Sequence, residues 1–234
     1  MPFLEEHHEI LQFIWDKVNP GNVISGGRTN RALALNSNET IYTLQKKTIN
    51  GKAVYILNFE RGGPPAKLTD LQCKVYATIT KNIHDVAHST YSYGTKELSG
   101  CHVHFTAEED VYEKEEFYEV KILHEEKYPD HELSPKIAYH AAVQCMHRKS
   151  KKLLVGFYND THVFLKLYMY QKLVEIADQR QPPFNLNIAE AMFSRNLREI
   201  INFVKKDGDR IMGKTVFIKK LITDKRKLQF VIQK

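Results

Sequence analysis

The segment EEFYEVKIL, residues 115–123, decides how the rest of this chain is interpreted. Its aromatic and branched apolar residues predict a strand with a buried face. Glu119 and Lys121 lie two positions apart, and in a strand such residues project from the same face. On that face the two side chains form either a solvent-exposed ion pair or part of a catalytic centre.

The catalytic interpretation needs a second carboxylate close by. Asp110 lies nine positions before Glu119, across a turn long enough for a hairpin, and Glu108 and Glu109 can substitute for it. Two carboxylates offer the oxygen ligands that Mg²⁺ and Mn²⁺ take, with substrate phosphate completing the shell. Lys121 would orient or polarise the attacking water beside the ion. The pattern D-x8-E-x-K therefore predicts a divalent-metal site.

The residues after E-x-K extend this pattern with AYHAAVQCMHRKSKKLLVGFYND, residues 138–160. The combination resembles the PD-(D/E)xK nucleases, and within them the lambda-exonuclease (YqaJ-type), viral alkaline-nuclease-like branch. This resemblance implies a restriction-endonuclease-like α+β fold, in which a central mixed β-sheet is flanked by helices. It implies that Asp110 and Glu119 are metal ligands and that Lys121 positions the water. It places Gln144 beside the metal, whereas an exposed helix position is the alternative for this residue.

A second part of the resemblance lies in NVISGGRTNRAL, residues 22–33, which is similar to a V-I-T-A-S turn that opens a helix and helps bind a terminal phosphate. Ser25 and Arg28 are the candidates for that role. A glycine-rich turn at a helix N-terminus, with a hydroxyl and a guanidinium, suits a phosphate group. A plain cap and turn is the other interpretation.

The chain also departs from the pattern of that family. Glu109 stands where the proline of the "PD" element is expected. The additional helix glutamate of the family would fall near Gln72, where no carboxylate is present. A Pro-Asp pair at Asp130 follows the E-x-K rather than preceding it, and we assign it to a loop.

The charge distribution favours a polyanionic partner. The formal net charge is +6, and residues 205–234 carry ten Lys and Arg against three Asp. A second basic cluster comprises Arg148, Lys149, Lys151 and Lys152. Such a balance favours nucleic acid over a membrane, and we expect these residues to follow a nucleic-acid backbone. A solvated basic surface is the alternative.

The composition is ordinary for a globular protein, with 42% hydrophobic and 26% charged residues among 234. No apolar run approaches the roughly 20 residues of a membrane span, and the acidic N-terminus lacks a secretory pattern. The three cysteines, Cys73, Cys101 and Cys145, are widely spaced and favour a reducing compartment. We therefore expect an intracellular protein, cytoplasmic or nuclear, without a membrane partner.

We expect one nuclease-like domain in three parts. Residues 1–66 would hold a helix over 4–18, a glycine-rich turn and a hairpin around Asn50-Gly51. Residues 67–180 would be the catalytic core, with helices capped by Thr69 and Ser134. Residues 181–234 would form a basic helix and a final hairpin.

A rival interpretation starts from GCHVHF, in which His102 and His104 match the histidine-hydrophobe-histidine motif of HUH endonucleases. Two histidines on one strand face can bind a metal. Tyr168 or Tyr170, with Lys172, would then serve in nicking single-stranded DNA. Histidines of the surface or core are the plainer alternative.

A non-catalytic module on a degenerate nuclease fold is a further alternative, with aromatic residues that stack on bases: Phe157, Tyr158, Tyr168 and Tyr170. The interpretation we favour is a Mg²⁺- or Mn²⁺-dependent deoxyribonuclease. The resemblance implies exonuclease action on duplex ends, with DNA favoured over RNA as partner. It also implies that a homo-oligomer can form, as in ring-forming members of the family.

Overall fold

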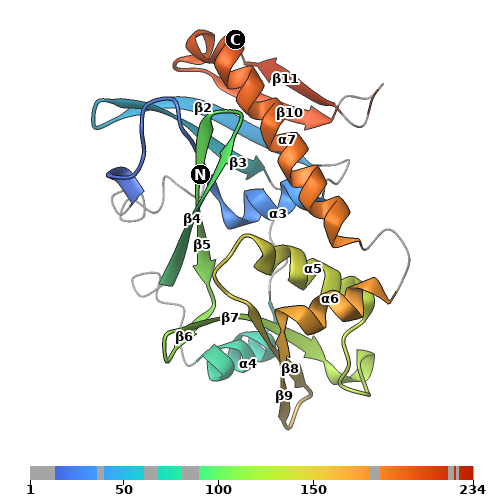
Figure 1. Ribbon diagram of the computed structural model, residues 1–234. Coiled ribbons are helices and arrows are strands. Elements are labelled where there is room, and N and C mark those ends of the chain that lie inside the picture. Colours follow the sequence, from blue (N-terminus) through green and yellow to red (C-terminus); the bar gives the residue numbers. More distant parts are fainter. Residues whose placement is uncertain are drawn as a thin grey trace. The chain divides into compact units, whose positions relative to one another are not determined.

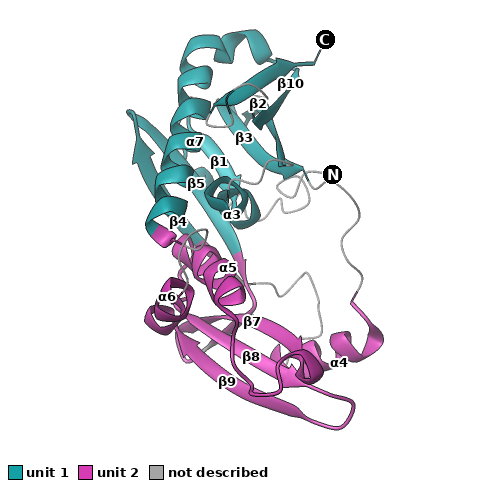
Figure 2. Ribbon diagram, turned by 90° about the vertical axis from the view of Figure 1, so that its right-hand side faces the viewer, with its two compact units in different colours: residues 1–64, 93–107, 187–234 teal, residues 65–92, 108–186 magenta. Residues whose placement is uncertain are grey.

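The computed structural model describes residues 14–35, 40–60, 68–80, 90–179, 185–220, 224 and 227–233. The chain forms two compact units (Figure 2). Unit 1 comprises residues 1–64, 93–107 and 187–234, and unit 2 comprises residues 65–92 and 108–186. Unit 2 is thus contributed by stretches that interrupt unit 1. That the two units together form one nuclease-like domain, as we expect from the sequence, stays a prediction.

Unit 1 is built on a seven-stranded mixed sheet of order β11-β10-β2-β3-β1-β5-β4 (Figure 1). Strand β1 pairs in parallel with β3 and β5, whereas β2 pairs antiparallel with β3 and β10. The end of β5 and the start of β4 belong to unit 2. The strands are β1 (Val23–Gly26), β2 (Ile41–Ile49), β3 (Lys52–Glu60), β4 (Thr90–Leu98), β5 (Cys101–Glu109), β10 (Thr215–Lys220) and β11 (Leu228–Ile232).

Two hairpins expected in this unit are present. Asn50 and Gly51 join β2 to β3 with φ of 47° and 78°, as a two-residue hairpin turn with positive φ at both positions requires. Strands β10 and β11 pair antiparallel near the end of the chain. Gln229 in β11 lies opposite Lys219 in β10.

The helices of unit 1 are α3 (Gly27–Leu35) and α7 (Leu186–Asp207), followed by the short η3 (Gly208–Ile211). Helix α7 buries an apolar stripe, and its Asn196 Nδ2 donates to the Leu33 carbonyl of α3 at 2.9 Å. No helix in the described parts of the chain is long and apolar enough to cross a bilayer. Most of the helix expected over 4–18 lies outside the described residues.

Unit 2 contains a four-stranded mixed sheet of order β6-β7-β8-β9. Strands β7 and β8 are parallel, and the other two pairs are antiparallel. The strands are β6 (Val111–Glu113), β7 (Glu116–His124), β8 (Lys152–Tyr158) and β9 (Val163–Met169). The helices are α4 (Asp70–Thr80), η2 (Glu125–Lys127), α5 (Pro135–Met146) and α6 (Tyr170–Asp178).

Helices cover both faces of this sheet (Figures 1 and 2). A Cβ placed on Gly156 of β8 would meet Ile79 of α4, so this face of the sheet lies under α4. Glu119 of β7 projects from the opposite face and contacts Gln144 of α5. Both units therefore contain mixed sheets flanked by helices, which confirms the predicted fold class, with the strands divided between two sheets.

The two predicted helix caps are also present. Ser134 Oγ accepts a hydrogen bond from the Ile137 N–H at 3.4 Å, and Pro135 occupies the first helical position. Thr69 Oγ1 accepts from the Gln72 N–H at 3.2 Å, while Gln72 Oε1 accepts from the Thr69 N–H at 2.9 Å. This reciprocal pair is a capping box, so Gln72 serves the first turn of α4.

We predict that Thr69→Ala lowers the free energy of unfolding by about 1 kcal/mol, because the first turn of α4 loses an acceptor. Thr69→Ser keeps the hydroxyl and should stay within about 0.5 kcal/mol of the parent. Urea unfolding monitored by circular dichroism measures both. Equal loss in the two variants would contradict a capping role for the hydroxyl.

Candidate active site

Strand β7 presents Glu119 and Lys121 on the face that α5 covers. Glu119 lies beside Leu153, and Lys121 beside Val155, in the parallel pairing of β7 with β8. Both neighbours are fully buried, and Glu119 itself is only 3% exposed. The opening segment thus places a carboxylate in the interior of unit 2, and not in a solvent-facing ion pair.

Three side chains surround the Glu119 carboxylate. Gln144 Nε2 donates to Oε1, and Arg148 Nη1 donates to Oε2 in a close ion pair. Lys121 Nζ lies 3.5 Å from Oε1 and donates to Gln144 Oε1 at 3.1 Å. Gln144 therefore bridges the lysine and the glutamate, so the structure brings these predicted residues together.

Asp110 is held against the same strand from the other side of the β6 turn. Its Oδ2 accepts a hydrogen bond from the Val120 N–H at 2.7 Å. Its Oδ1 accepts from the Tyr76 hydroxyl of α4 at 2.8 Å. Because Val120 directly follows Glu119, these bonds fix the second carboxylate next to the first.

Burial and like charge shape the electrostatics here. Burial, followed by the charge of Asp110, raises the pKa of Glu119 to about 7, although Arg148 and Lys121 oppose the shift. Burial alone would lower the pKa of Arg148, but Glu119, Asp110 and Glu109 more than offset it, so that this pKa is raised. The guanidinium is therefore the charge that balances a cluster of buried acids.

Glu109 is a third carboxylate of this cluster. It is 4% exposed, and neither of its oxygens accepts a hydrogen bond. Burial raises its pKa, while the Ser92 hydroxyl and the Lys149 N–H lie close enough to favour its ionised form in part. A buried carboxylate without hydrogen bonds, next to Asp110, is a place where an added cation would be stabilised.

These donors fit a hard divalent cation. Asp110 and Glu119 supply carboxylate oxygens, which Mg²⁺ and Mn²⁺ prefer, and such ions commonly keep water and substrate phosphate as their other ligands. Across the part of the chain that the structure describes, no three His, Cys, Asp or Glu side chains are grouped closely enough to hold an ion alone. The residues thus suit a site that substrate completes, and not a closed protein cage.

The basic cluster after α5 is divided between this centre and the surface. We expected Arg148 on the surface, but its side chain is 10% exposed and pairs with Glu119. Lys149 and Lys151 are exposed, and Lys151 Nζ donates to the Cys145 carbonyl at 2.8 Å. Lys152 forms an ion pair with Glu116. Lys149 and Lys151 are the cations of this cluster that remain accessible.

Ser25 and Arg28 lie in unit 1, whereas the residues around Glu119 lie in unit 2. Ser25 is in strand β1, fully buried, and its hydroxyl donates to Asn30 Oδ1 at 2.7 Å. Arg28 is exposed on α3. The Ser25 hydroxyl is thus engaged by an asparagine, and phosphate binding by Ser25 and Arg28 stays a prediction.

The histidine pair is also in unit 1, and its geometry does not favour the HUH interpretation. His104 is 3% exposed, with Nδ1 bonded to the Tyr93 hydroxyl at 2.8 Å and Nε2 bonded to Asn22 Oδ1 at 2.9 Å. Both ring nitrogens are therefore used within the protein. Burial, followed by the charge of His102, lowers the pKa of His104. The plainer alternative, a core histidine, describes His104.

The aromatic residues considered for base stacking are mostly interior. Phe157, Tyr158 and Tyr168 are at most 4% exposed. The Tyr168 hydroxyl donates to the His131 carbonyl at 3.3 Å. Only Tyr170 is partly accessible, and Lys151 Nζ lies over its ring, 5.1 Å from the centroid. A stacking platform built on these four side chains is not present.

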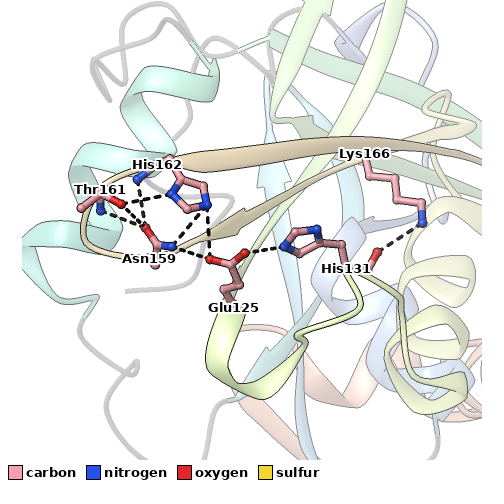
Figure 3. A network of polar contacts seen from close by, with 6 residues as sticks. All are labelled: Glu125, His131, Asn159, Thr161, His162 and Lys166. Carbon is pink, nitrogen blue, oxygen red and sulfur yellow. Dashed lines mark hydrogen bonds and ion pairs between the residues drawn. The ribbon is translucent and has the colours of Figure 1, made fainter.

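A polar network secures the far ends of β7 and β8 (Figure 3). Glu125 bonds with His131 Nε2 at 2.6 Å and accepts from the Asn159 side chain. Asn159 Oδ1 in turn accepts from the backbone N–H groups of Thr161 and His162, both at 2.9 Å. The segment after β7 is thus tied to the turn after β8, which supports the strands that carry the site.

Two residues of this centre were absent from our sequence-based assignment or were given another role. Tyr76 lies in the same helix as Gln72, the position where the family resemblance implied a glutamate, and no sequence motif marks Tyr76 itself. Arg148 resembles its basic neighbours in sequence. The one available signal was its place four residues after Gln144, a helical spacing, although α5 itself ends at Met146.

No protein-family model and no curated protein matches the chain. Solved structures share its fold at 10–15% sequence identity. Dxo1 of K. lactis, in complex with manganese, has 15% identity and a TM-score of 0.69, with 100% of this chain and 72% of that chain covered. Rai1 of S. pombe, in complex with 3'-FADP, has 10% identity and a TM-score of 0.63, covering 99% and 78%. Rai1 of Candida albicans, in complex with pU5 and Mn²⁺, has 11% identity and a TM-score of 0.60, covering 100% and 74%.

These structures correct one prediction and confirm another. The lambda-exonuclease branch is wrong, because the neighbours are Dxo1 and Rai1 proteins. They have a PD-(D/E)xK-like fold, which confirms the restriction-endonuclease-like fold class. The branch assignment rested on short patterns in residues 22–33 and 138–160, and motifs of that length carry a risk of false matches.

We predict that stability falls as pH rises through the titration of Glu119. Its pKa of about 7 in the folded protein lies above the usual value near 4.5, so the stabilisation is complete below that value and is lost as pH rises through about 7. The loss is on the order of 3 kcal/mol. In Glu119→Gln this part of the slope should vanish. Urea unfolding of both proteins between pH 4 and 8 measures it, and parallel pH profiles would contradict it.

Proposed function

We propose that this chain is a divalent-metal-dependent phosphodiesterase that acts on nucleic acid, with RNA preferred over DNA. The observation that carries the proposal is the buried group of Asp110, Glu119, Lys121 and Gln144 on and around β7. The neighbours in fold support it, since Dxo1 was crystallised with manganese and Rai1 with pU5 and Mn²⁺. The preference for RNA rests on the pU5 ligand and replaces the DNA specificity first expected.

In this mechanism Asp110 and Glu119 would hold Mg²⁺ or Mn²⁺. A bound ion of this kind supplies Lewis-acid polarisation of the scissile phosphate and makes water more acidic. Lys121 Nζ, fixed by Gln144 Oε1 at 3.1 Å, positions the attacking water and balances negative charge on the phosphate. The Tyr76 hydroxyl and the Val120 N–H keep Asp110 at the centre.

Lys149 and Lys151 are the candidates for contact with the backbone of the nucleic acid. Both are exposed and follow directly on α5, the helix that carries Gln144. Contacts of this kind carry little sequence information but position the strand and make binding depend on salt.

A non-catalytic binding module is the second candidate, and one observation favours it. Both oxygens of Glu119 and both oxygens of Asp110 already accept hydrogen bonds from protein groups. Helix α4 contributes Tyr76 in place of a further carboxylate. A fold that keeps nucleic-acid binding after losing metal binding would have these features.

We predict that the parent cleaves 5′-phosphorylated RNA with Mn²⁺ or Mg²⁺ and is inactive with EDTA. Asp110→Asn, Glu119→Gln and Lys121→Ala should each lower the rate at least about 100-fold. Glu175→Gln, an exposed carboxylate on α6, is the matched control and should leave the rate unchanged.

The products distinguish the remaining alternatives. Mononucleotides indicate an exonuclease, whereas internal fragments indicate an endonuclease. Faster cutting of DNA of the same sequence would contradict the preference for RNA. Binding without cutting of either nucleic acid would establish the binding module.

We predict that Lys149→Ala with Lys151→Ala makes binding of single-stranded RNA less sensitive to salt. Each lost phosphate contact should reduce the slope of log K against log salt by about 0.7, and two contacts by about 1.4. Fluorescence anisotropy between 50 and 300 mM KCl, roughly the range where such slopes are linear, measures this. Lys172→Ala is the control, and an unchanged slope in the double variant would exclude both lysines.

A further inference from the structure

Arg148 is a buried cation with an unused donor. Its side chain is 10% exposed, and its Nη1 pairs with Glu119 Oε2. Its Nε has no hydrogen-bond partner. Buried donors of this kind are rare in folded proteins, and they suggest a second position that the side chain adopts in another state.

Glu109 is the complementary group. It is a buried carboxylate with two oxygens that accept no hydrogen bond. Glu109 directly precedes Asp110, whose Oδ2 accepts from the Val120 N–H next to Glu119, the residue that Arg148 binds. The charges of Arg148 and Glu109 also act on each other's pKa, which agrees with this proximity. Arg148 thus has one carboxylate that it pairs with and a second one close by that lacks a partner.

We propose that Arg148 is an exchangeable counter-ion of the metal site: it pairs with Glu119 in the metal-free protein and moves to Glu109 when a divalent cation takes Glu119. This inference rests on the proposed function, because it requires that Asp110 and Glu119 hold a metal. A guanidinium and a divalent cation repel each other, so they do not share Glu119 Oε2. Glu109 offers the leaving guanidinium a carboxylate that can accept two parallel hydrogen bonds.

The exchange keeps the Arg148 guanidinium paired with a buried carboxylate in either state. Without metal, Arg148 neutralises Glu119; with metal, it neutralises Glu109. It also explains why Glu119 Oε2 accepts from a protein cation although its chemistry suits a metal ion. Arg148 therefore competes with the metal, and Glu109 weakens that competition.

The test is the affinity for Mn²⁺ alone, measured on the full chain by electron paramagnetic resonance of the free ion. Arg148→Gln should bind Mn²⁺ about tenfold more tightly than the parent, because the competitor is gone. Glu109→Gln should bind it about tenfold more weakly, because Arg148 has no other carboxylate to move to. In the Arg148→Gln background, Glu109→Gln should change the affinity by less than about twofold.

The combined variant separates this role from direct ligation. Glu109→Gln that weakens Mn²⁺ binding equally in both backgrounds would make Glu109 a ligand and overturn the exchange. Arg148→Gln that leaves the affinity unchanged or lower, while the parent binds Mn²⁺, would overturn it and leave the proposed function intact. A parent and an Arg148→Gln variant that both fail to bind Mn²⁺ would overturn both.

Folding of the variants is checked by thermal unfolding with and without Mn²⁺. Arg148→Gln should melt below the parent without metal and gain more from Mn²⁺, since Glu119 Oε2 then lacks its guanidinium partner until the ion binds. If this variant does not fold, Arg148→Lys is used, because it keeps the charge but loses the fork of donors. It should shift the Mn²⁺ affinity in the same direction by a smaller factor. Lys172→Gln, an exposed cation of unit 2, should leave the affinity unchanged.

Discussion

A carboxylate with almost no access to water must be neutralised or matched by hydrogen bonds, and unit 2 is arranged around that requirement at Glu119. Strand β7 brings the residue inside, and Gln144 and Arg148 reach it from α5 and the turn that follows. Asp110 then adds a second negative charge at the same place, held by the backbone of β7. Burial of any one of these charged groups would be unfavourable without the others.

The connection between β7 and β8 makes this meeting possible. Parallel neighbours require a long crossover, and here the crossover contains α5. The helix returns over the face from which Glu119 projects, so its last turn ends above that residue. A side chain 25 positions away in sequence therefore becomes a direct contact. No local pattern indicates this contact, because the two residues are far apart in sequence. A helix that connects two parallel strands is nevertheless expected to pack against their sheet.

Much of the fold could be predicted from short-range patterns in the sequence. The Asn50-Gly51 turn, the caps at Thr69 and Ser134 and the terminal hairpin depend on nearby residues, and all are present. The grouping of Glu119 with Lys121 and Gln144 was also expected, because the first two share a strand face and the resemblance to the PD-(D/E)xK nucleases implied a helix glutamine beside them.

What the sequence could not show depended on burial and on tertiary neighbours. Arg148 has the same formal charge as Lys149, and only the packing of α5 separates an interior guanidinium from a surface ammonium. Tyr76 had no motif to mark it, since a hydroxyl that supports a carboxylate is specified by the fold. The division of strands between two sheets likewise depends on pairings that are distant in sequence.

The interruption of unit 1 by unit 2 has a consequence for how the chain acquires its structure. Thr215 in β10 pairs with Gln45 in β2, so the central sheet joins residues 170 positions apart. Loops of that length raise the contact order, and proteins of high contact order fold slowly. During synthesis unit 2 is complete while the sheet of unit 1 still lacks β10 and β11, which leaves an edge of β2 without its partner strand. The unit that contains Glu119 can thus form first, and the basic C-terminal strands complete the other unit last.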